Sequence, residues 1–175
     1  MIAIANTRGR AIATAAASAL AVAGLGALTT DLGPWYAALK EPAWKPPDLL
    51  FGPAWTLIFA CTAAAGVIAW SRRRTALRDR DAAADGRERE WMLAAFALNA
   101  TLNLVWSLLF FRLHRPDWAF VEVFALWLSI VLLIVLAGRR SAAAAWLLAP
   151  YLAWVSFAAI LNHAVVRLNA PFGTA

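Results

Sequence analysis

Long apolar runs, each close to the length that crosses a membrane, are the feature that most constrains this chain. A backbone in lipid must satisfy its own hydrogen bonds, and a helix that crosses the hydrocarbon core needs about 20 apolar residues. We therefore expect an all-α integral membrane protein, a single five-helix transmembrane bundle over residues 1–175. The expected spans are about 11–28, 53–70, 91–111, 118–137 and 142–166.

The composition supports this class and excludes others. The chain is 63% hydrophobic and 15% charged, and the charges gather between the apolar runs. Its net charge of +6 would suit nucleic acid, but the basic residues flank spans and form no patch interleaved with aromatic residues, so we expect no nucleic-acid partner. The single cysteine, Cys61, lies inside an apolar run and gives no disulfide framework and no structural zinc site.

The first apolar run has two interpretations. Arg8 and Arg10 precede it and small residues fill it, which also describes a secretory signal peptide. We favour a retained span, because no polar mature domain follows the run.

The basic residues predict an orientation. Eleven of the sixteen lysines and arginines fall on the side of the N-terminus and the second and fourth loops. The positive-inside rule then places the N-terminus in the cytoplasm, and the first loop and the C-terminus outside. The Ala- and Arg-rich composition favours a bacterial membrane.

Residues 71–90 form the strongly polar stretch of the chain, with arginines interleaved with acidic residues. Such mixed charge is most simply a solvated loop, with room for one frayed helical extension. Residues 112–117 predict a tight polar turn.

The stretch from Trp35 to Thr56 holds four of the eight prolines and three of the ten tryptophans. Proline fixes φ, removes a backbone donor and biases the preceding residue to extended backbone, so most of this stretch is a stiff loop. Two interpretations remain open. The loop is either a lid over a binding site, with rings such as Trp44, or an interfacial connector whose rings lie among lipid headgroups.

Tryptophans also mark the ends of the spans. An interfacial aromatic belt accounts for them without a further role. They are Trp35, Trp70, Trp91, Trp118 and Trp146.

Polar and aromatic side chains within the spans gather at one depth. Two spans begin at the side of the proline-rich loop and two end there, so these side chains share the half of the bilayer that the loop would cap. They are Trp55, Asn103, Trp106, Glu122, Asn162 and His163.

Helical periodicity places several of these side chains on shared faces. Asn99, Asn103 and Trp106 recur at i, i+4 and i+7, and we expect a second face in the last span. One interpretation is a ligand pocket under the loop. The other is that the asparagines join helices, for about 1 kcal/mol each, and that the tryptophans fill space. The second face comprises Trp154, Ala158, Leu161 and Asn162.

Glu122 is the sharpest single indication of a site, because an intramembrane carboxylate is expensive to bury. It also lies near the start of its span, where it could cap the helix. Constellations of catalytic residues are absent from the sequence pattern, and we predict no catalytic and no metal-ligating residues. His163 could ligate haem iron, but a lone membrane histidine is more often a packing residue.

Four ordered motifs make the chain similar to the TspO/MBR family, the tryptophan-rich sensory proteins whose animal members are called translocator protein or peripheral-type benzodiazepine receptor. The resemblance covers nearly the whole chain. The motifs are Trp35-Tyr36 with Pro42-Ala43-Trp44-Lys45-Pro46-Pro47, then Phe51-Gly52-Pro53-Ala54-Trp55-Thr56, then Leu102-Asn103-Leu104-Val105-Trp106-Ser107 with Phe110-Phe111, and Pro150-Tyr151-Leu152-Ala153-Trp154 with Leu161-Asn162.

The resemblance implies a five-helix bundle, usually a homodimer, with a pocket beneath the first loop. Its ligands would be porphyrins such as protoporphyrin IX or haem, sterols and synthetic isoquinoline or benzodiazepine-type drugs. Carried over by position, the ligand-contacting residues would be Trp44, Trp55, Asn103, Trp106, Trp154 and Ala158, and Asn162 joins them by depth.

Two positions depart from the family pattern. His163 stands where the sterol motif has a tyrosine, which argues against sterol binding through that motif. Leu108 stands where many members have proline.

Three functions remain open at this point. Porphyrin binding with a regulatory or sensing role in tetrapyrrole metabolism or stress is the one we favour, with porphyrin as a ligand and no obligatory cofactor. A photo-oxidative porphyrin-degrading activity using Trp44 and Trp55 is the alternative. A porphyrin or sterol transporter is the third, but the chain shows no proton relay and no broken inverted helices.

Overall fold

The computed structural model describes residues 2–71 and 79–172, with side chains from 9 to 71 and from 85 to 172. Within this part of the chain, five helices are long and apolar enough to cross a membrane, which confirms the predicted fold class. They are α1 (Ile2–Thr29), α3 (Phe51–Ser71), α4 (Asp79–Ser107), α5 (Pro116–Gly138) and α6 (Ala142–Asn169). Short elements are α2 (Pro34–Ala37), the 3-10 turn η1 (Asp48–Leu50) and the π-helical turn η2 (Leu108–Arg112).

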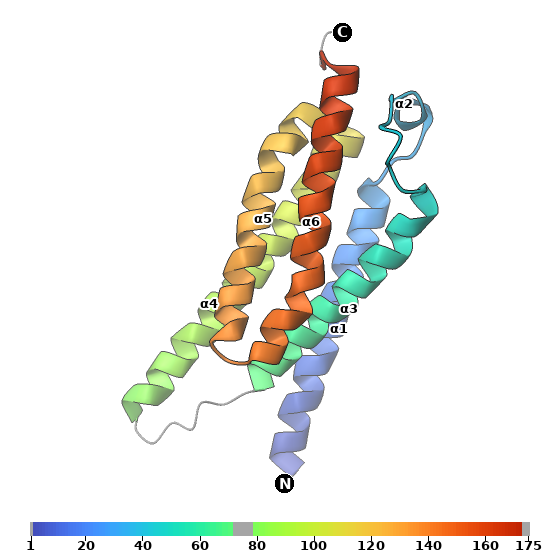
Figure 1. The fold of residues 1–175 in the computed structure, drawn as a ribbon. Helices are drawn as coiled ribbons and strands as arrows, with labels where there is room; N and C mark the ends of the chain where they lie inside the picture. Colours follow the sequence, from blue (N-terminus) through green and yellow to red (C-terminus); the bar gives the residue numbers. More distant parts are fainter. Residues whose placement is uncertain (1, 72–78, 173–175) are drawn as a thin grey trace.

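The long helices lie side by side in one bundle (Figure 1). Contacts join α1 to α3, α3 to α6, α6 to α5 and α5 to α4, and α4 touches α1 to close the ring. The N-terminus and the α5–α6 turn lie at one end of the bundle. The first loop, which we define as residues 30–50, lies at the other end with the C-terminus. The packing of α1 along α3 makes it one of the helices of the bundle.

Helix α4 begins at Asp79, well before the expected start of its span at Trp91. The helical extension that the expectation allowed is therefore present from Asp79 onward, while residues 72–78 of that stretch lie outside the described residues. Contacts of its charged side chains account for this helical extension. Arg89 pairs with Asp85 one turn earlier at 3.1 Å, and the guanidinium of Arg89 lies 5.0 Å from the ring centre of Trp70.

A buried arginine joins three segments at this end of the bundle. The Arg140 side chain is fully buried, and its Nη1 contacts Asp85 at 2.8 Å and Glu88 at 3.2 Å. Its Nε donates to the carbonyl of Ala69 at 2.7 Å, in the last turn of α3, where helix carbonyls lack partners of their own. The polar extension of α4 is thus part of the packed structure.

Hydrogen bonds between side chains join the helices in the interior. Asn99 Nδ2 donates to Ser129 Oγ at 2.8 Å, which connects α4 to α5. The indole of Trp127 donates to Ser156 Oγ at 2.9 Å, which connects α5 to α6. Each pairing satisfies a polar group that would be costly to leave unpaired in lipid.

The predicted polar turn after α4 is confirmed. The helix widens at Leu108 into the π-helical turn η2. His114 follows with a φ of 54°, a left-handed conformation that reverses the chain before α5.

Replacing Arg140 with methionine should destabilise the protein by about 3 kcal/mol, because the change leaves two carboxylates and a helix carbonyl without their partner. Unfolding in detergent, followed by circular dichroism, measures the loss. Arg139→Met is the matched control, since that side chain is exposed. Equal stability of the two variants would contradict a structural role for Arg140.

Candidate functional site

The first loop is attached to the α4–α5 corner by stacked rings. Trp35 stacks on His114 with ring centres 4.1 Å apart and meets Phe110 edge-on at 6.2 Å. Tyr36 contacts Phe111 at 5.7 Å. Trp35 therefore anchors the loop, a role in addition to the interfacial one expected for it.

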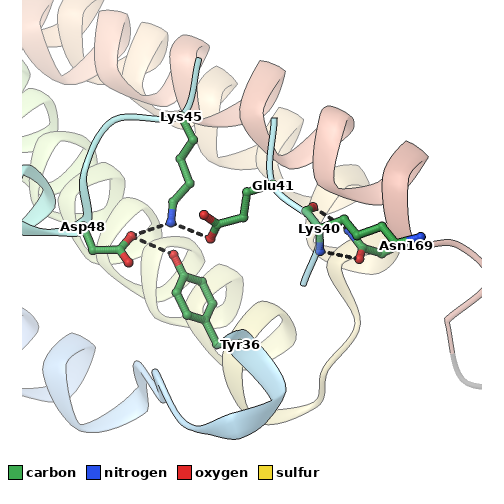
Figure 2. A network of polar contacts seen from close by, with 6 residues as sticks. All are labelled: Tyr36, Lys40, Glu41, Lys45, Asp48 and Asn169. Carbon is green, nitrogen blue, oxygen red and sulfur yellow. Dashed lines mark hydrogen bonds and ion pairs between the residues drawn. The ribbon is translucent and has the colours of Figure 1, made fainter. Parts of the chain in front are cut away.

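A second attachment joins the loop to the end of α6 (Figure 2). The backbone N–H of Lys40 donates to Asn169 Oδ1 at 2.8 Å, and Asn169 Nδ2 donates back to the Lys40 carbonyl at 2.9 Å. One side chain thus satisfies both backbone groups of a loop residue, as a neighbouring strand would.

A charged network gives the loop internal structure (Figure 2). Lys45 Nζ lies 2.5 Å from Glu41 and 2.6 Å from Asp48, and the Tyr36 hydroxyl donates to Asp48 at 3.0 Å. Burial alone would lower the pKa of Lys45, but the hydrogen bonds with Asp48 and Glu41 outweigh it and the pKa is raised. Burial also raises the pKa of Tyr36. The raised pKa of Lys45 means that its pairing stabilises the loop below the ordinary lysine pKa and weakens only as pH rises above it.

A row of aromatic rings runs from the loop to α6 and α3. Trp44 is 50% exposed and meets Phe157 edge-on at 6.0 Å. Phe157 lies 5.7 Å from Trp154, whose ring meets Phe51 at 5.5 Å. The exposed face of Trp44 thus lies at the rim of an aromatic surface.

Three helices meet at Tyr151 beneath the loop. Trp55 of α3 contacts its ring edge-on at 6.0 Å and stacks on Phe59 at 5.4 Å. Asn103 of α4 donates to the Tyr151 hydroxyl at 3.2 Å, and both of those side chains are buried. The structure thus brings together Trp55 and Asn103, two of the predicted site residues.

The remaining predicted residues lie around this centre. Trp106 stacks on Phe110 at 5.2 Å, so it links the interior to the ring cluster that holds Trp35. Ala158 is half-buried one turn after Trp154 on α6.

Asn162 faces a different neighbour. Its amide fits one orientation, in which the nitrogen donates to the Pro116 carbonyl at 3.0 Å and the oxygen accepts from the Phe120 N–H at 3.1 Å. The side chain is 1% exposed and ties α6 to the first turn of α5. This geometry matches the interhelical alternative, and a ligand contact for Asn162 stays a prediction.

The carboxyl oxygens of Glu122 are buried without a hydrogen-bond partner among the described residues. Both carboxyl oxygens are inaccessible, and no described residue donates to either. Glu122 lies two turns before Ser129 on α5, and Ser129 accepts from Asn99, so the same face is directed toward α4. A buried carboxylate with free acceptor atoms marks this region as one that would accept donors from a ligand.

The histidine that could ligate haem lies apart from these groups. His163 is exposed, with its ring 5.0 Å from that of Phe120. Among the side chains that the structure describes, no cluster of three histidine, cysteine or acidic residues is placed to hold a metal ion.

Tyr151 and Asn169 are the two important positions that the sequence reasoning missed. Tyr151 falls within a span, one turn before Trp154, and a buried hydroxyl there needs a partner, which is the signal that could have found it. Asn169 ends the last helix, and nothing in its local sequence indicates a bond to Lys40.

A family model for the TspO/MBR family matches residues 12–168. The chain belongs to this family. The matched segment runs from α1 through nearly all of α6, so the family likeness includes the first loop and the Tyr151 centre.

Three relatives support the assignment. The chain is 37% identical to the tryptophan-rich protein TspO of Chlorobaculum tepidum over 139 residues, 77% of this chain and 79% of that protein. It is 38% identical to the protein of the same name in Archaeoglobus fulgidus over 78% of this chain and 80% of that one. It is 32% identical to the translocator protein of Ovis aries over 77% of this chain and 75% of that protein.

Replacing Asn169 with alanine should loosen the first loop, because two hydrogen bonds to Lys40 are lost. Tryptic cleavage after Lys40 should become roughly fivefold faster, since a net loss of about 1 kcal/mol raises the open population by that factor. Leu168→Ala, an exposed neighbour, is the matched control. Cleavage at the control rate would show that the hydrogen bonds between Asn169 and Lys40 do not hold the loop.

Proposed function

We propose that this TspO/MBR protein binds a porphyrin, protoporphyrin IX or haem, or a related flat apolar molecule between the first loop and the Tyr151 centre. Occupancy would be the signal by which it senses or regulates tetrapyrrole metabolism or stress. The proposal includes a homodimer as the acting form. It concerns a ligand, and it assigns no catalytic residue.

The observation that carries the proposal is the meeting of Trp55, Asn103 and Tyr151 under a loop that is itself fastened to the bundle. Aromatic rings offer stacking surface to a flat ligand, and a few polar groups among them set its orientation. Trp44 at the rim, half exposed against Phe157, offers a further ring that could rearrange over a ligand.

Glu122 supports a ligand that brings its own hydrogen-bond donors. Its oxygens have no donor among the described residues, although burial of such a group is expensive. The pyrrole N–H groups of a free-base porphyrin are donors of the required kind. Docking such a ligand would satisfy the carboxyl group.

The double change Trp55→Phe with Asn103→Ala should weaken protoporphyrin IX binding at least tenfold, because it removes indole surface and an orienting amide. Titration followed by the Soret absorption of the porphyrin measures the affinity. Trp146→Phe is the matched control, since that indole is 77% exposed at the opposite end of the bundle. Unfolding curves show whether the variant remains folded. Unchanged affinity in a folded double variant would refute the site.

Replacing Glu122 with glutamine keeps the size of the side chain and changes what it offers to a donor. We expect binding of free-base protoporphyrin IX to weaken about fivefold, because the glutamine amide replaces one of the two acceptor oxygens with a donor group. Unchanged affinity for free-base protoporphyrin IX in a folded Glu122→Gln variant would remove Glu122 from the ligand contacts and leave the Tyr151 centre standing.

A further inference from the structure

A groove lies on α4 and α5 at the end of the bundle opposite the first loop. Its cavity volume is about 580 Å³, and its wall is formed by residues of these two helices. Arg87 near the start of α4 and Arg139 just after α5 lie at its polar end. Trp91, Leu98 and Leu132 form part of its apolar wall. None of these residues belongs to the candidate ligand site.

The charges in the groove are unbalanced. Glu88 also lines it, but that carboxylate is paired with Arg140, which is fully buried. Arg89 likewise forms an ion pair with Asp85. Neither Arg87 nor Arg139 forms an ion pair with any side chain that the structure describes. The polar end of the groove therefore offers two guanidinium groups to an anion.

The apolar part has the depth of one lipid leaflet. From Arg87 to Leu98 the helix advances about 16 Å, at roughly 1.5 Å per residue. Half of the hydrocarbon core of a bilayer is about 15 Å. Trp91, which is 69% exposed, lies one helical turn from Arg87 toward the middle of the span. An indole suits the boundary between headgroups and acyl chains.

We propose that this groove binds an anionic phospholipid of the adjoining leaflet. Its phosphate lies between Arg87 and Arg139, because a guanidinium matches phosphate in charge and in hydrogen-bonding geometry. Its glycerol lies beside Trp91, and an acyl chain follows Leu98 and Leu132. The site is independent of the porphyrin proposal, since it lies at the other end of the bundle.

Native mass spectrometry of the detergent-solubilised protein tests the proposal. Phosphatidylglycerol and phosphatidylcholine with identical chains are titrated in parallel. We expect a preference for phosphatidylglycerol of about fivefold for each arginine, and Arg87→Gln with Arg139→Gln should abolish it. Arg10→Gln is the control, because this exposed arginine belongs to α1, at the same end of the bundle but outside the groove.

A second variant keeps both arginines and blocks the apolar part. Ala94 lines the groove and is exposed, so Ala94→Phe should lower phosphatidylglycerol binding severalfold without changing the net charge. Equal binding of the two lipids by the unchanged protein would overturn the proposal. So would unaltered phosphatidylglycerol binding in Ala94→Phe with a reduced dimer signal, which would assign the groove to a second copy of the chain. If the double arginine variant does not fold, the Ala94→Phe result decides.

Discussion

The structure depends on the need to satisfy polar groups where no water is available. Asn99 with Ser129 joins α4 to α5, and Asn103 with Tyr151 joins α4 to α6. Such pairs are each worth only about 1 kcal/mol in lipid, but they are directional. They fix which faces of these helices meet, and the Tyr151 ring meets Trp55 of α3 edge-on beside them.

Polar groups at the two ends of the bundle are satisfied by different kinds of contact. At one end a single guanidinium, Arg140, is buried among two carboxylates and a helix carbonyl, which leaves little room for movement. At the other end the first loop is held by ring stacking on His114 and by the two exposed hydrogen bonds of Asn169. The contacts of the first loop are weaker than the buried ion pairs of Arg140 and closer to water. The bundle therefore opens for a ligand more easily at the first loop than at the Arg140 end.

The sequence predicted the fold class, five long apolar helices, because hydrophobic length is a local property. It also placed Trp55 and Asn103 in one region, and both contact Tyr151. It failed where the outcome depends on a partner distant in sequence. The helical extension from Asp79 is held by the ion pair between Asp85 and Arg140. The first loop is held by the hydrogen bonds between Lys40 and Asn169. Asn162 also shows this limit, because periodicity could not say that its amide would meet the first turn of α5.

By itself, the sequence determined that this chain is a five-helix membrane bundle of the TspO/MBR type with a stiff aromatic loop at one end, because apolar length, proline and tryptophan act through local physics. Only the tertiary structure decided which polar side chains are satisfied by other helices and which are left open. Asn103 has Tyr151, whereas the oxygens of Glu122 have no donor among the described residues. That difference comes from how helices pack against each other, and helix packing is a property of pairs of segments that no single segment encodes.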